Sequence, residues 1–293
     1  MTEKQNPEFK YVDEYGFDEA RLKEAFEEAC MALKGDRRRV YRVFDALFQL
    51  DQKAVLLHPQ KNLNQSEVSE LRRVIGDMAK GKPMAYALKQ EYFYGERFYV
   101  DERVLIPRYD TERSVDCIKA MAPKATRILE IGTGSGCVAI TLARLYPEAE
   151  VHGVDISSDA LDIAKFNAKN HGIKNVCFIE SDLFTKVRGR YDIIYSNPPY
   201  ITADEMKYLD KSVADYEPQG ALYGGEDGLD FYRKITAKAP KYLNNGGYLV
   251  FEIGAKQKKD VEKLLHEHHF SAIGCEKDFS GLDRVVYGRI ENV

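Results

Sequence analysis

Residues 127–143 have the sequence Arg127-Ile-Leu-Glu-Ile-Gly-Thr-Gly-Ser-Gly-Cys-Val-Ala-Ile-Thr-Leu-Ala143. This stretch predicts a strand, a glycine-rich turn and a helix in immediate succession. The glycines let the backbone turn sharply and leave room for a ligand, with the amino end of the helix behind it. Their Gly-x-Gly-x-Gly spacing favours S-adenosylmethionine over a dinucleotide, whose fingerprint is Gly-x-Gly-x-x-Gly. The predicted cofactor contacts in the turn are Gly132, Thr133, Gly134, Ser135 and Gly136.

Two further strands are predicted downstream, each with polar residues at its carboxyl end. The strand over 150–155 ends in Asp155, where the hydroxyl pair of a ribose would need an acceptor. The strand over 176–180 is followed by Ser181-Asp182-Leu183-Phe184, which could meet an adenine ring with one polar group and two apolar ones. We therefore predict Asp155, Asp182 and Leu183 as cofactor contacts.

A fourth predicted strand, over 191–196, continues into Asn197-Pro198-Pro199-Tyr200. The prolines end the strand and stiffen the chain, because each fixes its own φ and biases the preceding residue toward extended geometry. The Asn197 side-chain carbonyl and a neighbouring backbone carbonyl can accept two hydrogen bonds from one planar NH2 group, while Tyr200 offers a ring face. The alternative is an ordinary strand-to-loop turn, in which Asn-Pro is common.

These motifs, with others in the same order, resemble those of the peptide chain release factor glutamine-N5 methyltransferases, the HemK/PrmC family. The others are Gly81-Lys-Pro, Leu105-Ile-Pro-Arg-Tyr-Asp-Thr-Glu112, Glu217-Pro218, Gly225-Glu-Asp-Gly-Leu229 and Phe251-Glu-Ile-Gly254. Tyr109, where the family usually has a second proline, and Ala87, where it often has glycine, depart from the pattern. Both departures concern local linker geometry.

The resemblance implies methyl transfer from S-adenosylmethionine to the side-chain amide of the Gln in the Gly-Gly-Gln motif of a release factor. It implies that Asn197, Pro198 and Tyr200 are catalytic, that Asn197 also contacts the cofactor, and that residues 197–200, Pro199 included, bind the substrate. It also places residues 107–112 beside the methionine end of the cofactor. An N6-adenine nucleic-acid methyltransferase is the alternative, because an adenine amine presents a similar NH2 group. A dinucleotide oxidoreductase and a cofactor-binding adaptor without catalysis are the alternatives from other classes.

Composition favours a globular cytoplasmic protein. The 293 residues suit two domains, and an apolar content of 44% is ample for a buried core. A formal net charge of −4 argues against direct binding of nucleic acid, and so against the N6-adenine alternative. There is no signal-peptide core and no membrane span, and the five scattered cysteines are predicted to be reduced core residues. We expect a monomer.

The chain is predicted to have three parts. Residues 1–80 form a small helical domain that docks the substrate, with a staple and N-cap at Phe17-Asp18 and a later N-cap at Ser66. Its apolar helix faces are Leu22, Ala25, Phe26, Ala29 and Leu33, then Val40, Val43, Phe44 and Leu47, then Val68, Leu71, Ile75 and Met78. Residues 81–107 form a linker with a β-hairpin over 92–100.

Residues 108–293 are predicted to be the methyltransferase domain. Helices are expected over 111–122, 227–243 and 257–268, and strands over 247–253, after an Asn-Asn-Gly-Gly turn at 244–247, and over 270–277 and 284–290. The alternation predicts an α/β fold, the class I methyltransferase doubly wound parallel sheet with one reversed edge strand. No metal site is predicted at His266, His268 and His269, because a helix would send His268 away from the other two.

Overall fold

The computed structural model describes residues 20–291, and its contacts divide the chain into two compact units, one ending at Leu88 and one beginning at Lys89. The staple and N-cap predicted at Phe17-Asp18 lie outside the described residues. Within the described range, no helix is both long and apolar enough to span a membrane.

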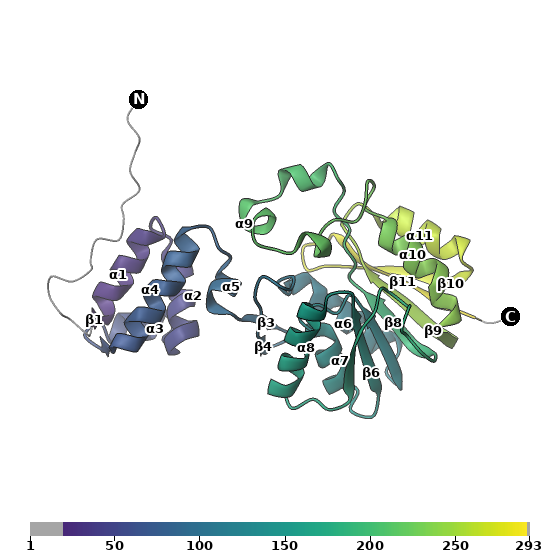
Figure 1. Ribbon diagram of the computed structural model, residues 1–293, viewed down its shortest axis with the longest axis horizontal. Helices are drawn as coiled ribbons and strands as arrows, with labels where there is room; N and C mark the ends of the chain where they lie inside the picture. The colour runs from purple at the N-terminus through teal and green to yellow at the C-terminus, as the bar shows by residue number, and fades with distance from the viewer. Residues whose placement is uncertain (1–19, 292–293) are drawn as a thin grey trace. The chain divides into compact units, whose positions relative to one another are not determined.

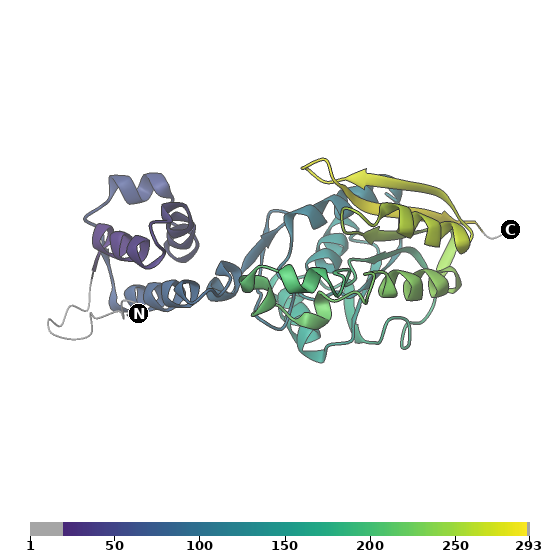
Figure 2. The same ribbon diagram turned by 90° about the horizontal axis from the view of Figure 1, so that it is seen from above.

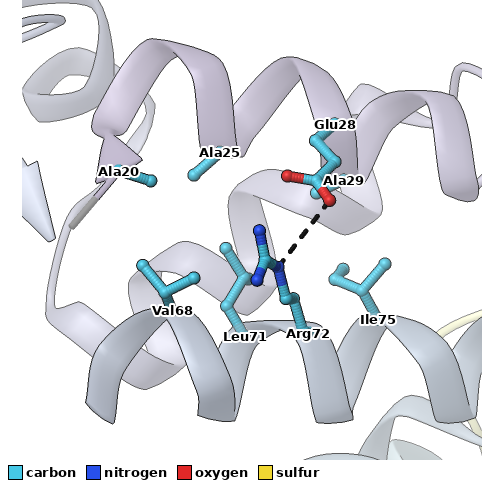
Figure 3. A pocket seen from close by; sticks show the side chains of 8 residues that line it. All are labelled: Ala20, Ala25, Glu28, Ala29, Val68, Leu71, Arg72 and Ile75. Carbon is cyan, nitrogen blue, oxygen red and sulfur yellow. Dashed lines mark ion pairs between the residues drawn. The ribbon is translucent and has the colours of Figure 1, made fainter. Parts of the chain in front are cut away.

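The first unit is helical. Its elements are β1 (Ala20–Arg21), α1 (Leu22–Ala32), α2 (Arg37–Phe48), α3 (Gln52–Leu57), β2 (Asn62–Leu63), α4 (Gln65–Ala79) and α5 (Met84–Leu88), with β1 paired to β2. The predicted apolar faces of α1, α2 and α4 meet in one core, in which Leu47 and Val68 are only partly buried. Figure 3 shows α1 facing α4 across a small pocket, which is crossed by an ion pair of 3.8 Å between Arg72 and Glu28.

The start of α4 differs from the prediction. Asn64, not Ser66, is the N-cap: its Oδ1 accepts from the Glu67 backbone N–H at 3.0 Å, and its own N–H donates to the Glu67 carboxylate at 2.8 Å. The prediction of Ser66 was wrong because this capping box satisfies two N–H groups that the helix leaves unpaired, whereas Ser66 lies inside the first turn.

The second unit is built on a seven-stranded sheet. Its strands are β5 (Arg127–Ile131), β6 (Glu150–Asp155), β7 (Val176–Glu180), β8 (Tyr191–Ser196), β9 (Leu243–Glu252), β10 (Phe270–Lys277) and β11 (Asp283–Ile290), in the order β10-β11-β9-β8-β5-β6-β7. The strands from β9 to β7 are parallel, as the hydrophobic pattern predicted, and the predicted class I fold is confirmed (Figure 1).

The reversed strand needs one correction. It is β11, antiparallel to both neighbours, and it lies one place inside the edge strand β10. The connection after β9 carries the chain past one strand position to β10, and the following hairpin returns β11 into that gap. Figure 2 shows this hairpin in yellow.

Helices cover both faces of the sheet. Residues of α6 (Glu112–Met121), α7 (Cys137–Leu145) and α8 (Ser158–Asn170) are buried against one face, and residues of α10 (Asp230–Lys238) and α11 (Lys258–Glu267) against the other (Figure 1). The predicted hairpin forms between β3 (Glu91–Phe93) and β4 (Glu96–Phe98). Phe93 and Phe98 are buried in the core that contains α6 and α7, so the hairpin belongs to the second unit.

Other expectations need local corrections. The helix predicted over 227–243 ends at Lys238 and continues as a short 3-10 turn, Ala239–Lys241, because Pro240 lacks an N–H and disfavours helix before it. The turn predicted at 244–247 is part of β9, where Gly246 has φ +80° beside a register shift against β8. Cys177 is exposed because it lies on the edge strand β7. Among the described residues, no three His, Cys, Asp or Glu side chains are grouped to hold a metal ion.

Candidate active site

The candidate site lies where the chain reverses its direction of winding across the sheet. From β5 the chain moves through α7 to β6 on one side, whereas β8 pairs with β5 on the other side, with Ile131 opposite Ser196. In open parallel sheets, this switch point leaves a crevice at the carboxyl ends of the strands. The structure therefore brings together Gly132 and Asn197, which follow β5 and β8 directly, with Asp155 next along the same edge.

The glycine turn after β5 is packed on its inner side and open on its outer side. Gly132 and Gly134 have φ of +75° and +53°, and a Cβ at either position would meet nothing within 4 Å. By contrast, a Cβ on Gly153 of β6, behind the turn, would lie 2.8 Å from the Phe178 ring. An open backbone surface with left-handed glycines suits a flat ligand lying against it, so the turn fits the cofactor that its spacing indicates.

The side chains of Thr133 and Ser135 are directed into the protein. Each is less than 5% exposed, and Thr133 Oγ1 donates to Glu130 Oε2 at 2.6 Å. The same oxygen accepts from the Ala139 backbone N–H at 2.9 Å, which ties the strand, the turn and α7 together. Burial raises the pKa of Glu130 to about 8. Thr133 and Ser135 can thus offer a cofactor mainly their backbone groups.

Asp155 is held in place by the backbone around it. Its Oδ2 accepts from the Gly134 N–H at 2.9 Å and its Oδ1 from the Ser157 N–H at 3.0 Å. Each carboxylate oxygen can accept a further hydrogen bond, so the ribose role predicted for Asp155 is compatible with both contacts. Ile156 follows with 71% of its surface exposed. We did not predict a role for this exposed apolar residue, although its position directly after Asp155 is visible in the sequence.

The segment after β7 is a constrained turn. Ser181 Oγ donates to the Leu183 carbonyl and accepts from the Lys186 N–H, both at 2.9 Å. Leu183 has φ +48°, a conformation that bulky residues rarely adopt and that is often found at binding sites. The Asp182 side chain is exposed and Leu183 is partly exposed, so both lie on an accessible, fixed turn. Phe184, the second apolar residue expected at the adenine ring, is instead buried in the core.

Asn197 offers an amide side chain that the rest of the structure does not use. It is partly exposed, and no residue in the range 20–291 makes a hydrogen bond to its side chain. Ser196, just before it, is anchored by a bond of 2.8 Å from its Oγ to the Ile131 carbonyl. Pro198 is buried, while Pro199 and Tyr200 are partly exposed, so the segment presents Asn197 from a fixed base.

Gln257 supports this segment from behind, and our sequence predictions missed it. Its Nε2 donates to the carbonyls of Tyr200 and Gly228, each at 3.1 Å, and its Oε1 accepts from the Gly254 N–H at 3.0 Å. Close backbone approach explains a further glycine: a Cβ on Gly224 would lie 2.6 Å from the Pro199 carbonyl. The Gly225–Leu229 and Phe251–Gly254 motifs thus flank Asn197–Tyr200.

Tyr200 lies near four charged side chains, those of Glu252, Arg284, Arg108 and Asp110. Arg108 Nη2 lies 2.5 Å from Glu217 Oε1, and the Ile106 N–H donates to Glu217 Oε2 at 3.3 Å. These contacts connect the predicted motif at 105–112 with Glu217-Pro218, over 100 residues later. Burial raises the pKa of Tyr200, so its hydroxyl stays protonated at neutral pH.

Comparisons with known proteins agree with this geometry. The sequence profile of the methyltransferase domain matches residues 122–282. A protein of Geobacter sulfurreducens named release factor glutamine methyltransferase is 41% identical over 249 residues, 85% of this chain and 87% of that protein. One of the same name from Thermodesulfovibrio yellowstonii is 34% identical over 94% of each chain. The chain belongs to the release factor glutamine methyltransferase family.

Solved structures bear on the fold of this release factor glutamine methyltransferase family member. A methyltransferase from Pyrococcus furiosus is similar with a TM-score of 0.53 and 18% identity, over 74% of this chain and 98% of that one. This likeness supports the methyltransferase fold and carries nothing about the substrate.

Proposed function

We propose that the chain transfers a methyl group from S-adenosylmethionine to the side-chain amide nitrogen of the Gln in the Gly-Gly-Gln motif of peptide chain release factors. The observation that carries this is the Asn197 side chain, which has no hydrogen-bond partner among the described residues and lies at the switch point beside the open glycine turn. The N6-adenine alternative is not favoured, because the relatives are named glutamine methyltransferases.

The cofactor would be held by residues at the carboxyl ends of β5, β6 and β7. The backbone of Gly132–Gly136 would contact its central part, the Asp155 carboxylate would accept from the ribose hydroxyls, and Asp182 and Leu183 would meet the adenine. S-adenosylmethionine supplies an electrophilic methyl group on a sulfonium, which carries a positive charge.

Asn197 and its neighbours would hold the substrate amide. An amide nitrogen is a poor nucleophile, because its lone pair is delocalised into the carbonyl. The Asn197 side-chain oxygen and the Pro198 carbonyl would accept both N–H groups of the substrate, which orients the nitrogen and stabilises positive charge that develops on it. Pro199 and the Tyr200 ring would enclose the side chain. The methylated, protonated amide is strongly acidic, so no strong base is required.

The helical part of the chain would serve docking. We propose that residues 1–80 hold the release factor, that residues 81–107 are the linker, and that residues 108–293 carry the chemistry. A Gly-Gly-Gln loop on a protein needs contacts elsewhere to present its Gln in line. Since release factors act during translation, the proposed substrate implies a cytoplasmic enzyme.

The direct test is incubation with labelled S-adenosylmethionine and purified release factor, followed by peptide mapping. Label on the Gln of Gly-Gly-Gln, and none when that Gln is replaced by Ala, is the expected result. Label on other residues, or equal label on the Ala variant, would overturn the proposal. Adenine-containing oligonucleotides in a parallel reaction test the alternative directly.

A further inference from the structure

Glu252 is the last residue of β9 and lies next to the proposed catalytic segment. In the parallel register of β8 and β9, Ser196 is opposite Phe251, so the residues that follow, Asn197 and Glu252, are neighbours at the carboxyl edge. Because side chains alternate along a strand, the Glu252 side chain is on the same face as that of Val250. None of the roles proposed above involves this carboxyl group.

The Glu252 side chain is buried and only partly satisfied. Its residue is 2% exposed, and the Thr111 hydroxyl hydrogen-bonds the carboxyl group. Oε2, however, has no hydrogen-bond partner among the described residues. Burial raises the pKa of Glu252 to about 7. The hydroxyls of Ser114 and Tyr195 are buried without partners in the described part of the chain as well. The buried carboxylate is therefore costly in isolation, and a cation in the adjoining crevice would stabilise its charge through the protein interior.

The protein's own cations do not neutralise Glu252. The titratable and charged groups that interact with it are Arg108, Asp110, Cys137, Tyr195, Tyr200, Tyr232 and Arg284. Both arginines have closer partners: Arg108 pairs with Glu217 at 2.5 Å, and Arg284 pairs with Asp278 at 3.0 Å. When Glu252 is ionised, this set of charged residues therefore carries excess negative charge beside Asn197.

We propose that Glu252 is the counter-ion for the sulfonium charge of S-adenosylmethionine. This inference rests on the proposed function, since it requires the cofactor to bind at the switch point with its methyl group near Asn197. S-adenosylmethionine has one more positive charge, on sulfur, than its demethylated product, S-adenosylhomocysteine. An ionised Glu252 would thus favour the methyl donor over the product and help the product to leave.

The expected pH dependence of cofactor affinity follows from the protonation state of Glu252 before the cofactor binds. Below about pH 7 the buried group is protonated, and above it the group is ionised. A nearby sulfonium favours the ionised form, so affinity for S-adenosylmethionine should rise as pH increases through this value and then level off. S-adenosylhomocysteine lacks the charge and should show no such rise. The sulfonium also lowers the pKa of the ligand's own amino group, so the contribution of Glu252 is read from the difference between the wild-type profile and that of a Glu252 variant.

The experiment is calorimetric titration of the full-length protein with each ligand from pH 6 to 8. For the wild type, we expect the preference for S-adenosylmethionine to grow up to about tenfold across this range. This is the size of effect expected from one partly screened pair of charges. Glu252→Gln, which keeps shape and removes the charge, should flatten the profile, and Glu252→Asp should keep part of it. Asp192→Asn is the matched control, because Asp192 accepts hydrogen bonds from Thr126 and Asn244 at the opposite end of the sheet.

The outcomes separate this inference from the proposed function. If neither ligand binds the wild type, the cofactor assignment itself fails. If both bind and their ratio is independent of pH, or if Glu252→Gln keeps the wild-type profile, Glu252 is not the counter-ion. If Glu252→Gln does not fold, Glu252→Asp decides, because it keeps the charge but moves the carboxyl group: an unchanged wild-type profile in that variant would also overturn the proposal.

Discussion

Asn197 holds a partly exposed amide on a backbone that two prolines and the Gln257 side chain keep in place. Asn197→Ala removes the proposed acceptor for the substrate amide and leaves the glycine turn intact. We expect turnover to fall roughly 10²-fold or more, as happens when one orienting and charge-stabilising group is lost. Affinity for S-adenosylmethionine should change little. Label transfer and calorimetry measure the two quantities, and a normal turnover number would remove Asn197 from the mechanism.

In contrast to Asn197, Asp155 should affect the affinity for the cofactor. Asp155→Ala removes the proposed partner of the ribose hydroxyls, and losing such a charge-assisted contact costs about 1.5 to 3 kcal/mol of binding free energy. The variant also leaves the N–H groups of Gly134 and Ser157 without their acceptor. Asp155→Asn keeps one acceptor oxygen and separates these effects. An unchanged dissociation constant for Asp155→Ala, measured by calorimetry, would contradict the ribose assignment.

At this scale, sequence reasoning works where a residue type is unusual for its position. Asn197 between a strand and two prolines, and Asp155 at a strand end, could be picked out in this way. Gln257 could not, because a Gln before a helix is common and its role depends on Tyr200 and Gly228, which come from distant segments. In the sequence, Glu252 stands out only as part of the Phe251–Gly254 motif, since its unpaired oxygen is visible only in three dimensions.

Helices and strands likewise have some features that the local sequence determines and others that depend on distant segments. The bounds of β6, β7 and β8 agree with the prediction because each is a short run containing β-favouring residues, with turn signals nearby. The place of β11 inside the edge was not predictable in this way, because the pairing of β9 with β11 instead of β10 leaves no mark within either strand.

The segment between β8 and α10 gives a test at the level of an element. A Cβ on Gly224 would lie 2.6 Å from both the Pro199 carbonyl and Tyr200 Cα, so Gly224→Ala must displace the catalytic segment. We expect turnover to fall at least about tenfold, since a shift of 1 Å can cost roughly 10². The fall should occur with little change in cofactor affinity.

Gly220→Ala is the matched control, because it lies in the same segment and its Cβ would meet nothing within 4 Å. It should keep turnover within about twofold of the wild type, as surface substitutions usually do. Equal loss of turnover in both variants would mean that the segment tolerates no added side chain at either glycine, whatever the space around it. Equal activity in both would mean that Asn197–Tyr200 are not held by this contact.

On the scale of the whole molecule, the chain divides into one unit that contains the predicted cofactor contacts and one unit that contains none of them. Every predicted cofactor contact lies in the second unit, which begins at Lys89. The first unit has its own core, and Ala87 of α5 is buried in it. A truncation that respects this division therefore begins at Lys89 and not at residue 81, where the change in sequence pattern and the Gly81-Lys-Pro motif placed the predicted boundary.

Deleting residues 1–88 should spare cofactor binding and impair methylation of intact release factor more than that of a short Gly-Gly-Gln peptide. The physical reason is that a mobile loop on a large protein is presented in line only if other contacts hold the protein, whereas a peptide never makes those contacts. Both substrates are compared on the same truncated enzyme, after circular dichroism and calorimetry with S-adenosylmethionine have shown that it is folded and binds. If the peptide and the intact protein lose activity by the same factor, the first unit supports stability or site geometry and is not a docking domain.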